Sequence, residues 1–195
     1  MTDRKLTKKE KRDNRDRARE RFHLERRKNL LAEPGQSPLV MVLDHLKPDF
    51  NVGKIFRTAD AFAVREIHMV GMEYFDPSPA MGSFRWVPAH FHDDFAACHD
   101  ALVARDYALF ALDVAGPERL DTVRFPERSA FIMGHEQLGL SFKLSDYPRV
   151  RGLVIPQFGK VQSLNVSIAA AVVMYEYLRQ WPPGAGVSVG EPRET

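Results

Sequence analysis

The chain has 195 residues, enough for one domain with a full hydrophobic core and an appendage. Its composition, 44% hydrophobic and 28% charged, is typical of a globular protein. No apolar run approaches the roughly 20 residues that cross a bilayer, and the N-terminus has no signal-peptide core, so we expect a cytoplasmic protein. Cys98 is the only cysteine, which excludes an intrachain disulfide and a cysteine-based zinc site, so we expect a buried structural thiol.

The basic charge is concentrated at the N-terminus. Residues 1–33 contain 13 Lys or Arg against 7 Asp or Glu, a net charge of +6, so residues 34–195 have 15 against 19, a net charge of −4. A helix is allowed here, but apolar residues are too sparse for most of it to pack. We expect either a solvated or disordered extension or a basic arm that follows a phosphate backbone, with candidate contacts at Lys8, Lys9, Lys11 and Arg12.

The segment PGQSP, residues 34–38, predicts a linker between this arm and a domain of residues 34–182. Residues 39–43 (LVMVL) then form an unbroken apolar run, typical of a strand in a parallel sheet covered on both faces. Residues 183–195 read as a flexible tail. Further strands are expected at 66–71, 107–112, 130–133 and 153–155, with helices at 51–64, 96–105 and 163–179. This alternation predicts an α/β domain with a mainly parallel sheet flanked by helices.

A first candidate functional segment, residues 51–64, reads NVGKIFRTADAFAV. Asn51 is predicted to cap this helix. Arg57 lies within two turns of the cap, so its guanidinium can return toward the loop at the helix start. The alternative is a surface arginine paired with Asp60, three residues along the helix.

A second segment, GHEQLGLS at residues 134–141, follows an expected strand directly. Its two glycines lie five positions apart around Glu136, which predicts a tight loop. Ser141 is then positioned to cap a short helix. One acid between two glycines is a weak pattern by itself.

The third segment, residues 153–179, reads LVIPQFGKVQSLNVSIAAAVVMYEYLR. A proline ends the strand, and Ser163 is predicted to cap a helix that runs to about Arg179. Ser163 and Asn165 stand with Gln162 among apolar neighbours, where polar groups are costly to bury unless a ligand or a partner chain satisfies them. The alternative is an ordinary capped helix after a polar loop.

Two other groups of residues are candidates for contacts with RNA or a metal ion. Arg85 and Trp86 lie in a long loop, where they can contact RNA by charge and stacking or anchor the loop in the core. His90, His92 and Asp93 form an HxHD segment, but without a distant third ligand we expect no zinc. The chain has no P-loop and no GxGxxG after a strand, so a dinucleotide-binding fold is not supported.

Together, the three segments resemble the motifs of the SpoU (TrmH) class of RNA ribose 2'-O-methyltransferases, in the SPOUT superfamily. NxGxIxRTADA at residues 51–61 resembles the first motif, GHEQLGLS the second, and IP..G...SLNVS.A.....YE the third, in the same order. The resemblance implies a C-terminal trefoil knot, which ordinary connection rules would not predict. It also implies bound S-adenosylmethionine, no catalytic metal, and a homodimer in which the partner subunit completes the active site.

The resemblance assigns site residues by position. The family's usual methionine after Ile-Pro is replaced by Gln157, a departure that concerns the details of the pocket. The implied cofactor contacts are Leu112, Gly134, Ile155 and Leu164; the implied catalytic residues are Asn51, Arg57, Glu136, Ser163 and Asn165; and the RNA contacts are Arg57, Arg85 and the basic arm.

Arg57 is the implied activator of the ribose 2'-hydroxyl. A guanidinium, with a pKa above about 12, is a donor only and a poor base. The alternative is that Arg57 binds the RNA phosphate and stabilises the developing alkoxide, while the proton passes to a phosphate oxygen or water. Both interpretations stay open at this point.

The RNA substrate is a separate question. The wording VQSLNVS and the short single-domain chain resemble the members that methylate a guanosine in the tRNA D-loop. Alternatives are large-subunit rRNA, the tRNA anticodon loop, a non-catalytic RNA-binding protein, and a structural dimer that binds no cofactor.

Overall fold

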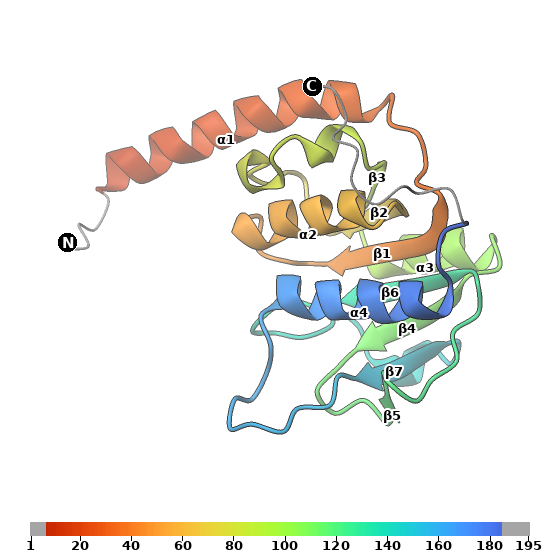
Figure 1. The fold of residues 1–195 in the computed structure, drawn as a ribbon. Helices are drawn as coiled ribbons and strands as arrows, with labels where there is room; N and C mark the ends of the chain where they lie inside the picture. The colour runs from red at the N-terminus through yellow and green to blue at the C-terminus, as the bar shows by residue number, and fades with distance from the viewer. Residues whose placement is uncertain (1–6, 185–195) are drawn as a thin grey trace.

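A computed structural model describes residues 7–184; the predicted tail lies outside the described residues from residue 185 onward. In the described part, seven strands form one sheet in the order β3-β2-β1-β6-β4-β7-β5, and every neighbouring pair is parallel (Figure 1). The predicted α/β class with a parallel sheet is therefore confirmed. The strands are β1 (Ser37–Asp44), β2 (Val64–Val70), β3 (Ala89–His92), β4 (Ala108–Leu112), β5 (Glu118–Arg119), β6 (Ser129–Met133) and β7 (Val150–Val154).

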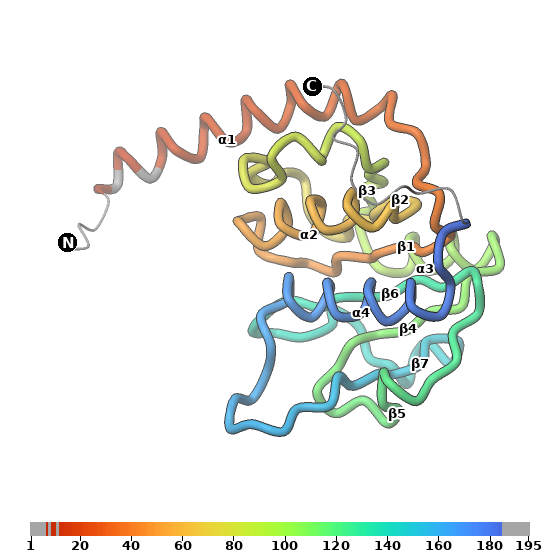
Figure 2. Tube along the Cα trace, in the orientation of Figure 1, coloured from red at the N-terminus to blue at the C-terminus, as the bar shows by residue number. Residues whose placement is uncertain are grey.

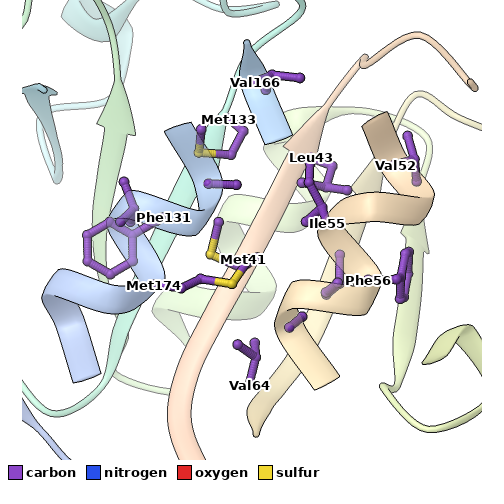
Figure 3. Packing of buried hydrophobic residues seen from close by; sticks show 14 of the residues in the cluster. Met41, Leu43, Val52, Ile55, Phe56, Val64, Phe131, Met133, Val166 and Met174 are labelled. Carbon is purple, nitrogen blue, oxygen red and sulfur yellow. The ribbon is translucent and has the colours of Figure 1, made fainter. Parts of the chain in front are cut away.

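Helices cover both faces of the sheet. On one face, Ile55 of α2 and Met174 of α4 pack in one cluster with Met41 and Leu43 of β1 (Figure 3). Cys98 and Leu102 of α3 pack with β1 and β4 side chains in a second cluster on the other face. Among residues 7–184, no helix has the length and apolarity needed to cross a bilayer. The helices are α1 (Lys8–Asn29), α2 (Phe50–Ala61), α3 (Phe95–Val103) and α4 (Val166–Gln180), with short 3-10 turns η1 (Ser78–Ala80), η2 (Ser83–Arg85) and η3 (Leu144–Asp146).

The strand order brings the three sequence motifs together at the carboxyl ends of the strands. β1, β6, β4 and β7 are consecutive neighbours, although they are distant in sequence. Their last residues are in register, since Leu43 and Leu112 both pair with Met133, and Leu112 pairs with Leu153. The loops that follow these four strands therefore start side by side, where parallel sheets place their ligand sites.

Two predicted helix caps are wrong. The N-cap of α2 is Asp49, whose carboxylate accepts a hydrogen bond from the Asn51 backbone N–H at 3.3 Å, so Asn51 lies inside the helix. The N-cap of α4 is Asn165, whose side chain accepts from the Ser167 N–H at 3.0 Å, and Ser163 lies two residues before it. In both helices the N-cap is a residue two positions from the predicted one. In α2 this leaves the Asn51 side-chain amide available for contacts elsewhere.

The basic arm is a helix that packs against the domain, so the expected separating linker is wrong. Thr7 and Glu10 form a capping box at its start. Phe22 is 3% exposed and stacks on Phe84 in the main core. The buried Asn29 amide donates to the carbonyl oxygens of Phe84 and Val87, both at 2.7 Å. The N-terminal half of α1 extends away from the body, on the side toward which the β1 arrow points (Figure 1).

We expect Phe22→Ala to destabilise the protein through the docking of α1. Removing a buried phenyl ring costs about 3 kcal/mol in the free energy of unfolding. Urea unfolding followed by circular dichroism measures this change. Leu24→Ala, which truncates a side chain that is 60% exposed on the same helix, should stay within about 0.5 kcal/mol of the wild type. Equal stability of the two variants would mean that α1 is not docked.

Candidate active site

A pocket of about 510 Å³ lies at the edge where the motif loops meet. It is formed by the ends of β4, β6 and β7, the loops after them, and the start of α4. The longest of these loops connects β7 to α4 and swings away from the body before returning (Figure 2). Its lining includes Leu112, Gly134, Ile155 and Leu164, the four predicted cofactor contacts, together with Glu136, Ser163 and Asn165.

The glycine loop after β6 has the predicted tight form. His135 and Gly139 exchange two backbone hydrogen bonds, at 2.8 and 2.9 Å. Gly139 has φ +74°, which favours glycine. A Cβ atom at Gly134 would lie 2.7 Å from the Gly139 carbonyl carbon, so the two glycine backbones approach more closely than any side chain allows. The short helix that follows this loop is η3, whose N-cap position is Lys143, so the prediction that Ser141 caps it is wrong.

Ser141 instead anchors the loop to β1. Asp44, fully buried at the end of β1, accepts hydrogen bonds from the Ser141 backbone N–H at 2.7 Å and from its hydroxyl at 2.8 Å. His45 contacts the same carboxylate at 2.8 Å. Asp44 was not among the predicted site residues, and its only signal in the sequence is that an acid directly follows an apolar strand.

One residue from each motif meets in a hydrogen-bonded junction beside the pocket. The Asn51 side-chain N–H donates to Glu136 Oε1 at 2.9 Å. The Asn165 side-chain N–H in turn donates to Asn51 Oδ1 at 3.2 Å. The Lys47 backbone N–H approaches the other Glu136 oxygen at 3.5 Å. The first motif, which contributes no residue to the pocket lining, is thus tied to the other two.

Glu136 is held as a carboxylate at this junction. Partial burial by itself would raise its pKa, but hydrogen bonds from the Asn51 side chain and from backbone N–H groups outweigh burial and lower the pKa. Its oxygens accept these bonds and have no proton to donate at neutral pH. Glu136 is therefore suited to ordering Asn51 and the glycine loop, and unsuited to act as a general acid.

The pocket has the character of a site for a flat, partly polar ligand. Leu112, Ile155 and Leu164 provide apolar walls. Gln157, also in the lining, has a buried Oε1 with no hydrogen-bond partner within the described chain. A buried acceptor without a partner is costly, and a ligand with an N–H donor would satisfy it. The apolar walls and the unpaired acceptor therefore fit S-adenosylmethionine, which combines an adenine ring with amino groups.

Arg57 does not line this pocket. It is exposed on α2 and makes no hydrogen bond or ion pair within residues 7–184, so the alternative pairing with Asp60 is not present. Arg85 is partly buried in η2, and its Nε has no partner in the same part of the chain. Lys9 and Arg12 are exposed on α1. The side chains of Lys8 and Lys11 lie outside the described residues.

Comparison with known proteins agrees with this geometry. The model of the SpoU rRNA Methylase family matches residues 38–175, which include all three motifs and all four strands of the pocket edge. The chain belongs to the SpoU rRNA methylase family. The match begins after α1, so this helix lies outside the region that the family model covers.

Individual relatives of this SpoU chain act on two kinds of RNA. It is 33% identical over 153 residues to a tRNA (guanosine(18)-2'-O)-methyltransferase of Thermus thermophilus, covering 74% of this chain and 76% of the relative. It is 29% identical over 170 residues to a 23S rRNA (guanosine-2'-O-)-methyltransferase of Neisseria meningitidis, covering 85% and 66%.

A solved structure shows the same fold. The SpoU methyltransferase AviRb from Streptomyces viridochromogenes, in complex with the cofactor AdoMet, matches with a TM-score of 0.65 and 25% identity. The match covers 75% of this chain and 61% of AviRb. The SpoU chain described here thus corresponds to somewhat less than two thirds of that protein.

Proposed function

We propose that this protein methylates a ribose 2'-hydroxyl in structured RNA, with S-adenosylmethionine as the methyl donor and a tRNA D-loop guanosine as the target. The observation that supports this most is the junction of Asn51, Glu136 and Asn165, which joins three distant motifs beside the pocket. A merely structural capped helix would not require these three side chains to meet. We assign the protein to the cytoplasm, where tRNA is modified.

The chain's own residues have distinct roles in this proposal. Leu112, Ile155 and Leu164 enclose the adenine ring in a dry slot, and the backbone at Gly134 supplies hydrogen bonds. Ser163, which is exposed at the mouth of the pocket, and Asn165 contact the incoming nucleotide. When bound, S-adenosylmethionine supplies the methyl group that the ribose oxygen attacks.

Arg57 acts on the RNA side of the reaction. It is exposed and unpaired in the described chain, so its five N–H donors are available to a phosphate and to the developing alkoxide. Because a guanidinium stays protonated at neutral pH, the 2'-hydroxyl proton leaves to a phosphate oxygen or to water. Of the two interpretations, electrostatic stabilisation fits the described contacts better than a role as a base.

The active form is a homodimer. Ile168, Val172 and Tyr175 form an exposed apolar stripe along α4, at helical spacing, and α4 starts at the pocket. Such a stripe is costly in water and suits a second copy of the chain. Arg57 lies outside the pocket of its own subunit, so we assign it to the pocket of the partner. The predicted trefoil knot, which concerns the threading of residues 134–165, stays a prediction.

The helix α1 serves as an additional RNA contact. It carries eleven Lys or Arg against five Asp or Glu between Lys8 and Asn29, a net charge of +6. Only its C-terminal half is docked, and the free half points past the active-site edge of the sheet (Figure 1). Large-subunit rRNA is the second candidate substrate, because one relative is a 23S rRNA methyltransferase.

We expect the double variant Lys9→Ala, Arg12→Ala to bind RNA more weakly and with a smaller salt dependence. Each lost phosphate contact lowers the slope of log Kd against log salt by roughly 1. The measurement is a binding titration with unmodified tRNA at several salt concentrations. Arg149→Ala is the matched control, because this exposed arginine precedes β7 at the opposite end of the strands. An unchanged slope in the double variant would remove α1 from the binding surface.

The proposed reaction is tested by methyl transfer from labelled S-adenosylmethionine to unmodified tRNA and, separately, to 23S rRNA transcripts. Mapping the modified ribose then identifies the nucleotide. A single 2'-O-methyl group in the tRNA D-loop is the expected result. Transfer to rRNA alone would support ribose methylation and contradict tRNA as the substrate. Binding of S-adenosylmethionine without transfer to either RNA would contradict both the proposed reaction and the proposed substrate.

A further inference from the structure

A cluster of metal-binding side chains lies at the β3 edge of the sheet, away from the proposed active site. His68 Nδ1, on β2, is 2.8 Å from His92 Nε2, at the end of β3. Cys98 Sγ, on α3, is 3.7 Å from the same His68 nitrogen. All three atoms lie within 4.8 Å of one another. From the sequence alone, the HxHD segment had no distant ligand; the fold supplies His68 and Cys98.

These distances are close to those around a tetrahedral zinc ion. With Zn–N bonds of about 2.0 Å and Zn–S bonds of about 2.3 Å, neighbouring nitrogen and sulfur ligands lie about 3.6 Å apart and two nitrogens about 3.3 Å. The observed N···S distance of 3.7 Å already matches. The N···N distance of 2.8 Å requires His92 to move outward by about 0.5 Å. His92 is only partly buried, so its ring has room for this movement.

The buried histidine is oriented as a metal ligand would be. Its other nitrogen, Nε2, lies 3.0 Å from Glu66 Oε1 and donates to it when Nδ1 is free to bind. Metal-bound histidines commonly donate their second N–H to a carboxylate in this way, which fixes the tautomer and the ring orientation. Glu66 is itself fixed by an ion pair with Arg105. The side chain that presents Nδ1 to the cluster is therefore held rigidly.

A second grouping, Glu66, His68 and His90, also lies within ligand distance. It is the poorer site, because the Glu66 carboxylate is already paired with Arg105, whose positive charge repels a cation. Two imidazoles and a thiolate are also the softer ligand set, which zinc prefers over calcium or magnesium.

We propose that His68, His92 and Cys98 bind one zinc ion that joins β2, β3 and α3. The single cysteine of the chain is sufficient, because the set is His₂Cys and a water molecule takes the fourth position. His92 also lines a cavity of about 540 Å³ beneath α1, which gives the ion a path from solvent. The ion stabilises the sheet edge against which α1 packs, and it lies outside the pocket proposed for methyl transfer.

The test uses the full-length protein after removal of metals with a chelator. Cobalt(II) is titrated as an optical substitute for zinc, and zinc(II) is added in thermal unfolding. We expect one equivalent of cobalt to produce a thiolate-to-cobalt absorption band, which only Cys98 can generate in this chain. Zinc should displace the cobalt and raise Tm. The absence of both the band and the rise in Tm would overturn the proposal.

Variants locate the ion. We expect Cys98→Ser to abolish the absorption band and His92→Gln to weaken zinc affinity at least tenfold, with circular dichroism to verify folding of each variant. His99→Gln is the matched control, because His99 neighbours Cys98 but contacts Asp100. If His90→Ala abolishes binding while Cys98→Ser does not, the ion occupies the Glu66 grouping and the proposed ligand set is wrong.

Discussion

Replacing Arg57 with alanine is expected to lower methyl transfer by about 100-fold or more while leaving S-adenosylmethionine affinity within about twofold. The large loss follows because a donor aimed at developing charge in a transition state contributes on the order of 10²–10³ in rate. Cofactor binding is spared because Arg57 is exposed and lies outside the pocket lining. Single-turnover transfer to tRNA and calorimetric titration of the cofactor measure the two effects separately.

Lys54→Ala is the matched control, since Lys54 is an exposed cation one turn earlier on α2. It should retain nearly full transfer. Arg57→Lys should stay impaired, because an ammonium group cannot reproduce the two-pronged contact of a guanidinium. Undiminished transfer by Arg57→Ala would remove this residue from the reaction.

The second large effect is expected for Gly134→Ala, which should weaken S-adenosylmethionine binding at least tenfold. The new Cβ atom would lie 2.7 and 2.8 Å from the Gly139 carbonyl carbon and oxygen. These are backbone atoms in a closed loop, so they cannot rotate away as a flexible side chain would. The loop must open, and its two glycines both line the pocket.

Gly159→Ala is the matched control for this variant. Gly159 lies in the neighbouring loop between β7 and α4, and a Cβ atom there would meet nothing within 4 Å. Its cofactor affinity should equal that of the wild type. Normal affinity in Gly134→Ala, with a native circular dichroism spectrum, would contradict the role of this loop in the pocket.

The two disabled variants also test the assignment of Arg57 to the partner subunit. Assayed at a low S-adenosylmethionine concentration, homodimers of Arg57→Ala and of Gly134→Ala should both be strongly impaired. A mixed dimer contains one site with both residues intact. Unfolding and refolding the two together should therefore recover part of the activity. If Arg57 serves its own subunit, every site in the mixed dimer lacks one residue and no activity returns.

The buried strands and the family of this protein follow from local patterns in the sequence. Unbroken apolar runs such as residues 39–43 predict buried parallel strands, because both faces of such a strand are covered. The three motifs predict the SpoU family, which the family match over residues 38–175 confirms. Local patterns of this kind succeed because strand burial and tight glycine turns depend on neighbouring residues.

Local patterns predicted helix caps less well where two nearby residues could each cap the same helix. Asp49 and Asn165 cap their helices in place of the predicted Asn51 and Ser163. Residues 1–33 contain too few apolar residues to predict docking. Nevertheless, the ring of Phe22 and the side-chain amide of Asn29 attach α1 to the domain. A few well-buried contacts outweighed the average composition of the segment.

Contacts between side chains that are distant in sequence depend on the fold as a whole. Asn51 bonds to Glu136, 85 positions away, and to Asn165, 114 positions away, because β1, β6 and β7 end at the same edge of the sheet. Cys98 likewise approaches His68 only because α3 packs on β2. Strand order and helix packing are properties of the whole core, and no local propensity of the chain encodes these distances.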